Sequence, residues 1–210
     1  MNKPLIVAGV DVGGTKKGFH AIALEDDAYL AQCSSTSAAE VAAWCQQIGA
    51  VCVGVDAPCQ WSTGGARACE RALAQDRISS FITPTRANAE QNTTGFYGWM
   101  FNGEKSFAAL SAHYVLFNGT FGGLCRPLCF ETFPQAIAGR LAGKSVSAKQ
   151  KGRVRRELLQ RAGLDIGALT NIDKVDAALC ALAAHRFLLG DFKPYGESAT
   201  GFIIVPASAL

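Results

Sequence analysis

This chain of 210 residues contains little histidine and little charge. Its three histidines and eight cysteines include no C-x-x-C pair and no zinc-site spacing, so the sequence predicts no zinc site and no disulfide framework. Charged residues make up 18% and hydrophobic residues 49% of the chain, which argues against intrinsic disorder. The net charge of +3 is too small to predict nucleic-acid binding, so contact with a polyanion requires a local basic cluster.

The chain also lacks a run of about 18 apolar residues, so we expect no transmembrane helix and no membrane partner. The apolar stretch that begins at Leu5 is interrupted by Asp11, and no small-residue cleavage site follows it. We therefore predict a cytoplasmic protein. There is no G-x-S-x-G nucleophile motif and no Walker A loop. The length fits a single domain over residues 1–210, which can bury roughly 70% of its unfolded surface without a disulfide or metal.

Apolar periodicity and turn residues predict an alternation of strands and helices after an initial run of strands. The predicted strands are at 5–12, 17–24, 28–33, 51–55, 126–131 and 202–205, and the predicted helices at about 37–48, 65–75, 105–117, 136–141, 149–162 and 173–189. Residues 79–103 are polar, turn-rich and aromatic, which indicates an inserted loop or lid. The order predicts an α/β fold with a mixed sheet and helices on its faces, where ligands bind beyond the carboxyl ends of strands.

Acidic residues stand where this fold would bring them together. Asp11, Asp56 and Glu131 each end a predicted strand, and Asp173 and Asp176 lie on one face at the start of the last helix. Clustered carboxylates repel one another unless a cation lies among them. Oxygen ligands without histidine suit Mg²⁺ or Mn²⁺. Two such ions about 4 Å apart would activate water and stabilise the leaving oxygen in phosphodiester cleavage.

Each carboxylate except Asp176 also has a purely structural explanation. Asp11 can begin the tight turn that follows it, and Asp56 can be a strand-end residue before a proline. Glu131 can pair with a nearby arginine, either Arg126 or Arg140. The first carboxylate of the last helix can be a capping-box acid three residues after a threonine. Taken together, their placement favours a shared metal site.

Seven basic residues fall within positions 144–161, against one acid. In a helix over 149–162, Lys149, Arg153 and Arg156 would share a face, which suits a phosphate backbone or equally a solvated surface. Arg67 follows Asp56 closely and can reach a phosphate or form ion pairs on its helix. The aromatic residues at 96–101 can stack on bases or close the core.

Six motifs in order resemble the family called domain of unknown function 429, described as predicted nucleases with a ribonuclease H-like fold. The motifs are Gly9-Val10-Asp11, Val55-Asp56-Ala57-Pro58 with Arg67-x-Cys69-Glu70, Phe130-Glu131-Thr132-Phe133-Pro134, Lys149-Gln150-Lys151-Gly152-Arg153, Asp173-x-x-Asp176-Ala177 and Gly201-Phe202-Ile203-Ile204-Val205-Pro206. The resemblance implies a ribonuclease H-like fold: a five-stranded mixed sheet, an antiparallel meander then parallel strands, with helices on both faces and an added C-terminal strand.

The pattern Asp173-x-x-Asp176-Ala177 also resembles the last helix of RuvC-type junction resolvases. This resemblance implies that Asp11, Asp56 and Asp176 hold metal and that Asp173 assists or orients water, while Glu131 has no firm counterpart in the family pattern. We therefore predict a nuclease that cleaves DNA or RNA, including structured forms, by a two-metal-ion mechanism with Mg²⁺ or Mn²⁺. Many small nucleases work as symmetric dimers, so a homodimer is a further expectation.

Two other functions stay open at the level of sequence. The segment Gly9-Val10-Asp11-Val12-Gly13-Gly14-Thr15-Lys16 resembles the first phosphate loop of sugar kinases of the actin-like ATPase superfamily, although no second such loop is present. A nucleic-acid- or protein-binding module that kept the fold without catalysis is the second alternative.

Overall fold

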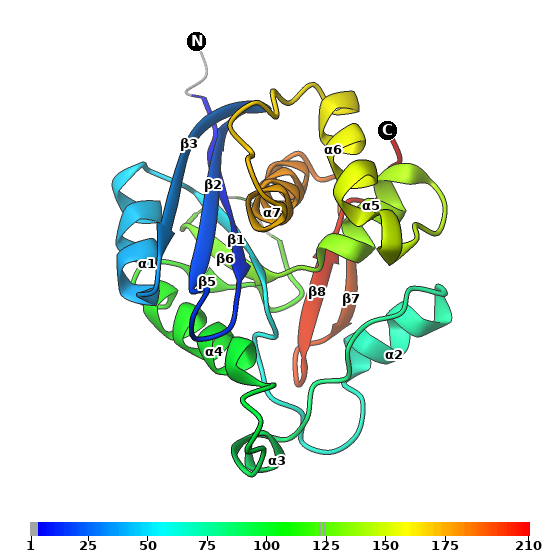
Figure 1. The fold of residues 1–210 in the computed structure, drawn as a ribbon. Coiled ribbons are helices and arrows are strands. Elements are labelled where there is room, and N and C mark those ends of the chain that lie inside the picture. The colour runs from blue at the N-terminus through cyan, green and yellow to red at the C-terminus, as the bar shows by residue number, and fades with distance from the viewer. Residues whose placement is uncertain (1–3, 122, 124) are drawn as a thin grey trace.

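The computed structural model describes residues 4–121, 123 and 125–210. Its strands are β1 (Ile6–Val12), β2 (Phe19–Glu25), β3 (Ala28–Ser35), β4 (Cys52–Asp56), β5 (Val115–Leu116), β6 (Leu128–Glu131), β7 (Lys193–Glu197) and β8 (Gly201–Val205). Its α-helices are α1 (Ala38–Gln47), α2 (Ala68–Gln75), α3 (Arg86–Glu90), α4 (Gly98–Leu110), α5 (Pro134–Ala142), α6 (Lys151–Arg161) and α7 (Ile172–Leu188), with a 3₁₀ turn (Ala148–Gln150) before α6 (Figure 1).

All of these strands belong to one mixed sheet. Its order is β3-β2-β1-β4-β6-β8-β7, and β5 pairs with β6 outside this path. The β1–β2–β3 meander and the β7–β8 pair are antiparallel, whereas β1–β4, β4–β6 and β6–β8 are parallel. The predicted α/β class and the mixed sheet are therefore confirmed. The described residues form eight strands, however, where the sequence predicted five and an added C-terminal one.

The two strands missed by the sequence prediction are short or atypical. β5 has two residues and lies inside the predicted helix 105–117. β7 contains Pro194 and Gly196, which disfavour strands except at an edge, and β7 is an edge strand of the sheet. The predicted loop 79–103 was also wrong in part, because it contains α3 and the first residues of α4.

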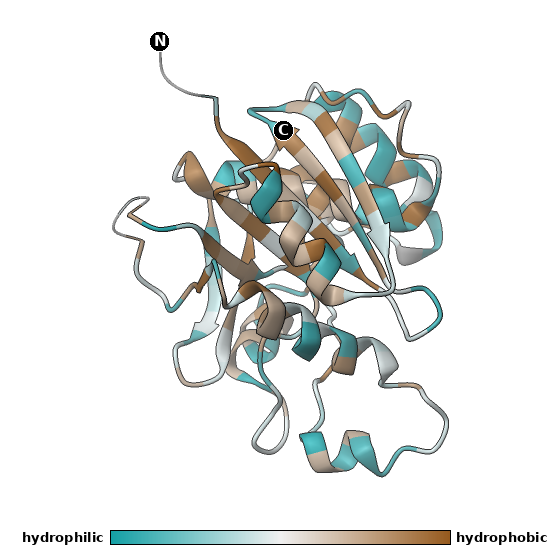
Figure 2. Cartoon of the chain, turned by 90° about the vertical axis from the view of Figure 1, so that its left-hand side faces the viewer, coloured by the Kyte–Doolittle hydropathy of each residue, from teal (hydrophilic) through white to brown (hydrophobic). Residues whose placement is uncertain are grey.

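The two faces of the sheet carry separate hydrophobic clusters, because side chains alternate along each strand. Val7 belongs to the cluster that α5, α6 and α7 cover, whereas Ala8, Val10 and Val12 belong to the cluster that α1 and α4 cover. Figure 2 shows apolar residues concentrated in the sheet and hydrophilic residues on the outer helices. No helix within the described part of the chain is both long enough and apolar enough to span a membrane.

Helix α7 lies very close to β1 and β4 because two glycines face it. Gly9 and Gly54 are register partners on these strands. A Cβ at Gly9 would lie 2.1 Å from the carbonyl oxygen of Ala177, and one at Gly54 would lie 2.6 Å from that of Cys180. Residues two positions further along a strand point to the same face. The Gly-x-Asp pattern in both strands therefore directs their terminal aspartates toward α7.

Candidate active site

Asp11 and Asp56 lie side by side at the carboxyl edge of the sheet. They are register partners on the parallel strands β1 and β4. Asp176 follows Val175 in the second turn of α7, the helix that rests on both strands. Asp11 and Asp176 are 9% and 6% exposed, and Asp56 is partly buried. Three carboxylates from three elements thus share a poorly solvated part of the protein.

Burial and mutual repulsion make these carboxyl groups weak acids. The pKa of Asp11 is raised to about 7, chiefly by burial and further by the charges of Asp176 and Asp173. The pKa of Asp56 is raised well above its usual value by burial and then by the charges of Asp11 and Asp176. Burial also raises the pKa of Asp176, against the opposing effect of Arg155. The three carboxyl groups therefore favour their neutral, protonated forms, and a bound cation would favour the ionised forms instead.

Asp176 is already paired with a buried arginine. Nη1 of Arg155, on α6, donates to Oδ1 of Asp176, and Nη2 donates to Oε1 of Gln135, on α5, at 3.0 Å. Arg155 is 5% exposed, and its Nε is a buried nitrogen without a hydrogen-bond partner. The guanidinium thus holds α5, α6 and α7 together at the edge of the carboxylate site and balances part of its charge.

Asp173 lies one turn before Asp176 and binds Lys17 of the turn between β1 and β2. The Lys17 Nζ donates to both carboxylate oxygens at 3.0 and 3.1 Å, and Nε2 of His20 lies 3.8 Å from Oδ2. The N-cap of α7 is Asn171, whose side chain accepts from the N–H of Lys174. The capping-box explanation for Asp173 is therefore wrong, and its contacts face the glycine turn after Asp11.

These carboxylates do not form a ready-made ligand set. Among residues 4–121, 123 and 125–210, no group of three or more His, Cys, Asp or Glu side chains is placed to hold one metal ion. The Arg155 ion pair with Asp176 is one cause, because it directs Oδ1 of that carboxylate to the guanidinium. The predicted metal role of Asp11, Asp56 and Asp176 stays a prediction.

Glu131 and Arg67 bind each other in the interior, which agrees with the ion-pair alternative for each residue rather than with a metal role or a phosphate contact. Arg67 donates from Nη1 and Nη2 to the two Glu131 oxygens at 2.8 and 2.6 Å, and from Nε to Glu70 at 2.9 Å. The N–H of Cys59 donates to Glu131 as well. Both oxygens of Glu131 are thus engaged, and Arg67, 3% exposed, is not available to a substrate phosphate. The predicted alternative partners of Glu131, Arg126 and Arg140, are not its partners.

The predicted basic stripe is only partly present on the surface of α6. Lys149 lies in the 3₁₀ turn before the helix and is exposed. Arg153 is exposed and pairs with Glu157, one turn later on the same helix. Arg156 is half-buried and donates to the carbonyl oxygen of Leu169 at 2.6 Å, and its predicted phosphate contact stays a prediction. Phosphate binding by Lys149 and Arg153 stays a prediction.

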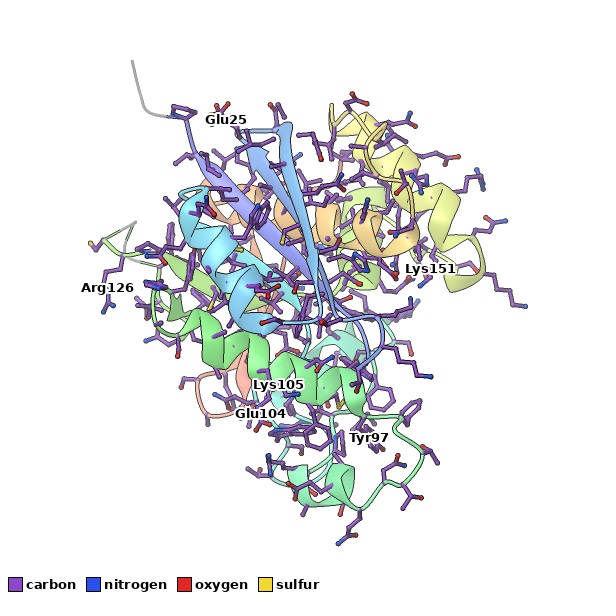
Figure 3. The ribbon with its side chains drawn as sticks, turned by 60° about the vertical axis from the view of Figure 1, so that its left-hand side comes forward. Glu25, Tyr97, Glu104, Lys105, Arg126 and Lys151 are labelled. Carbon is purple, nitrogen blue, oxygen red and sulfur yellow. The ribbon has the colours of Figure 1, made fainter. Side chains whose placement is uncertain are left out.

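Three cations that approach the carboxylates were not assigned there from the sequence. They are Arg155, Lys17 and Lys151. The charge of Lys151 lowers the pKa of Asp11, and Figure 3 labels this lysine at the start of α6. A signal for Arg155 was present, because it shares a helix face with the buried residues Leu158 and Leu159. An arginine on an apolar face needs a buried acidic or polar partner. Lys17 had no such signal, since its partner lies 156 positions away.

Comparison with known proteins identifies one family. A family model described as a protein of unknown function, DUF429, matches residues 9–200. No curated protein and no solved structure matches the chain. The matched span includes all the carboxylates of the site and both glycines under α7.

Proposed function

Because this chain belongs to the DUF429 family of proteins of unknown function, whose description names no activity, we propose from its site that it is a metal-dependent phosphodiesterase acting on nucleic acid. The observation that carries the proposal is the meeting of Asp11, Asp56 and Asp176 at one edge of the sheet, where burial disfavours ionisation of all three and the charge of Asp176 adds to this effect at Asp11 and Asp56. A strand order with an antiparallel meander followed by parallel strands supports the finer proposal of a ribonuclease H-like fold.

The chemistry of the three carboxylates suits a hard divalent cation such as Mg²⁺ or Mn²⁺. Their oxygens are the ligands that these ions prefer, and their mutual repulsion would be relieved by positive charge. Asp11, Asp56 and Asp176 would hold the cations, with Asp176 exchanging its bond to Arg155 for one to metal. When bound, a pair of such ions supplies an activated water and stabilises the leaving oxygen of a phosphodiester.

Other residues of the protein would orient the attacking water and bind the phosphate backbone. Asp173, fixed by Lys17, lies beside the site and would orient the attacking water. Lys151 and Lys149, both exposed at the start of α6, would attract the phosphate backbone. Arg155, once released by Asp176, would remain as a buried cation beside the reacting phosphate.

The kinase alternative is less well supported by the glycine turn. The N–H of Gly13 donates to the carbonyl oxygen of Gly18, and the N–H groups of Lys17 and Gly18 donate to that of Gly14. These donors are used within the turn, whereas a phosphate loop presents its N–H groups to the nucleotide. Lys17 is also engaged with Asp173.

The test is cleavage of labelled single-stranded, duplex, hairpin and junction substrates with Mn²⁺, comparing the wild-type protein with Asp11→Asn. We expect the variant to lose at least a hundredfold in rate while its circular dichroism spectrum is unchanged, because a metal ligand is removed and the shape of the side chain is kept. Asp27→Asn, at the exposed turn between β2 and β3, is the matched control and should cleave normally.

Equal cleavage by the wild type and Asp11→Asn would mean that the activity comes from elsewhere, and the site would be wrong. Consumption of ATP with a sugar, and no cleavage, would favour the kinase. Nucleic-acid binding that depends on salt and is the same in both proteins, without turnover, would favour the binding module.

A further inference from the structure

An exposed aromatic cluster lies on the segments that flank α3. Phe81, Ile82 and Phe96 are 42%, 58% and 56% exposed. The Phe81 ring centroid lies 5.6 Å from that of Phe96, 6.2 Å from that of Tyr97 and 6.0 Å from that of Trp99. We call these five residues the aromatic cluster. Figure 1 shows α3 and its flanking segments projecting below the sheet, and Figure 3 labels Tyr97 there.

The aromatic cluster is continuous with the carboxylate site. Asp56, Phe81 and Trp99 line the same cavity, whose volume is about 60 Å³. The helix that begins beside the cluster is also fixed to the turn after Asp11, because Nδ2 of Asn102 donates to the carbonyl oxygen of Gly13 at 2.9 Å. A group that lies on the cluster is therefore next to the edge of the sheet where the carboxylates meet.

The exposed rings are held in place by buried polar contacts. The N–H of Thr83 donates to Oε1 of Glu70 at 3.0 Å, and Glu70 is bound to Arg67, which in turn binds Glu131 at the end of β6. This network anchors the segment that carries Phe81 to the sheet. Its exposed rings are thus preorganised, which lowers the entropic cost of binding a ligand.

Two other aromatic residues of the same region are half-buried, as Tyr97 and Trp99 are, and they pack against each other. The rings of Trp61 and Phe101 lie 5.0 Å apart, and Trp61 donates to Glu104 at 3.1 Å. The remaining large apolar side chains that are exposed, Leu30, Val115 and Leu189, lie on other elements. Exposed aromatic rings are the side chains on which unpaired bases stack in proteins that bind single-stranded nucleic acid.

We propose that the aromatic cluster is a stacking site for unpaired nucleobases, and that the substrate of the carboxylate site is therefore single-stranded nucleic acid. This inference rests on the proposed function. The cavity is too small to enclose a base, so bases would stack on the outer faces of Phe81 and Phe96. Bases in a duplex are stacked on each other and cannot do this. The exposed Lys16 in the turn after Asp11 would lie near the backbone of such a strand.

The test measures binding without cleavage, in an Asp11→Asn background with Mg²⁺. Fluorescence anisotropy would compare three labelled probes: a single-stranded oligonucleotide, the corresponding duplex and an abasic strand of equal charge. The test protein carries Phe81→Ala and Phe96→Ala. The matched control carries Leu30→Ala and Leu189→Ala, which remove two exposed apolar side chains elsewhere.

We expect the test protein to bind the single strand at least tenfold more weakly than the control, because alanine removes two stacking partners. Both proteins should bind the abasic strand equally, and the parent should prefer the single strand to the duplex. Equal binding of the single strand by test and control proteins would overturn the proposal. An equal loss of affinity for the single strand and for the abasic strand would also overturn it. If sedimentation showed a change in oligomeric state and binding did not change, the cluster would be a protein interface instead. Stacking-dependent binding, together with no cleavage by the wild-type protein, would overturn the proposed nuclease and leave the stacking site intact.

Discussion

The ionisation of Asp11 is linked to the stability of the fold. Its pKa of about 7 exceeds the ordinary value of 3.8, so between these pH values the folded protein binds a proton that the unfolded chain releases. Stability therefore falls as the pH rises through this window, and the loss is complete above about pH 7. One pKa unit corresponds to about 1.4 kcal/mol, so the loss is roughly 4 kcal/mol at most.

Asp11→Asn should remove this pH-dependent cost in the metal-free protein. Urea denaturation with a chelator should show the variant more stable than the wild type by about 1–4 kcal/mol at pH 8 and by less than about half as much at pH 5, because Asn resembles the protonated acid. A difference in unfolding free energy that is the same at both pH values would show that repulsion at Asp11 is not its cause.

Arg155 pairs with Asp176, a carboxylate that we propose as a metal ligand. Arg155→Met should lower the unfolding free energy by about 3–5 kcal/mol without metal, because it leaves Asp176 buried and unpaired. The same variant should bind Mn²⁺ more tightly, by about tenfold, since Asp176 no longer exchanges a partner. Electron paramagnetic resonance of free Mn²⁺ measures this affinity, with Arg153→Met on the exposed side of α6 as the control. Weaker Mn²⁺ binding by Arg155→Met would contradict the exchange.

At the scale of elements, the close packing of α7 against β1 and β4 brings the carboxylates together. Gly54→Ala should place a methyl group 2.6 Å from the Cys180 carbonyl oxygen and lower the unfolding free energy by about 1–3 kcal/mol. It should also weaken Mn²⁺ binding, because α7 carries Asp176. Gly152→Ala on α6, where the added carbon meets nothing within 4 Å, is the control and should be neutral or stabilising. Equal stability and Mn²⁺ binding in the two variants would contradict this role of Gly54.

The elements also differ in how well their sequences predicted them. The meander, β4, α1 and α7 have clear periodicity or caps, such as Ser37 at the start of α1, and their predicted bounds were close. The prediction failed for α4, whose first residues contain Gly98 and several aromatic side chains typical of a loop. This helix is fixed by tertiary contacts, including the hydrogen bond from Asn102 to the glycine turn.

For the whole molecule, metal binding and folding should be coupled. A ligand that binds only the folded state at a hundred times its Kd stabilises by about 2.7 kcal/mol. For a chain of this size, Mn²⁺ at that level should raise the Tm of the wild type by about 5–10 °C. Differential scanning calorimetry should show no such rise for Asp11→Asn, whereas Asp27→Asn should behave as the wild type. A similar rise in Asp11→Asn would place the ion elsewhere.

The sequence by itself determined the fold class and the positions of the acidic residues. Alternation fixes which face of a strand each residue occupies, and Asp11 and Asp56 lie at or next to the ends of strands whose apolar character is evident locally. Only the tertiary structure decided the partners: Arg155 for Asp176, Lys17 for Asp173, and Arg67 for Glu131. These pairs join residues 21 to 156 positions apart, and a charge has no periodicity from which a distant partner can be inferred. The metal site predicted from carboxylates alone therefore lacked the buried arginine that now holds one of them.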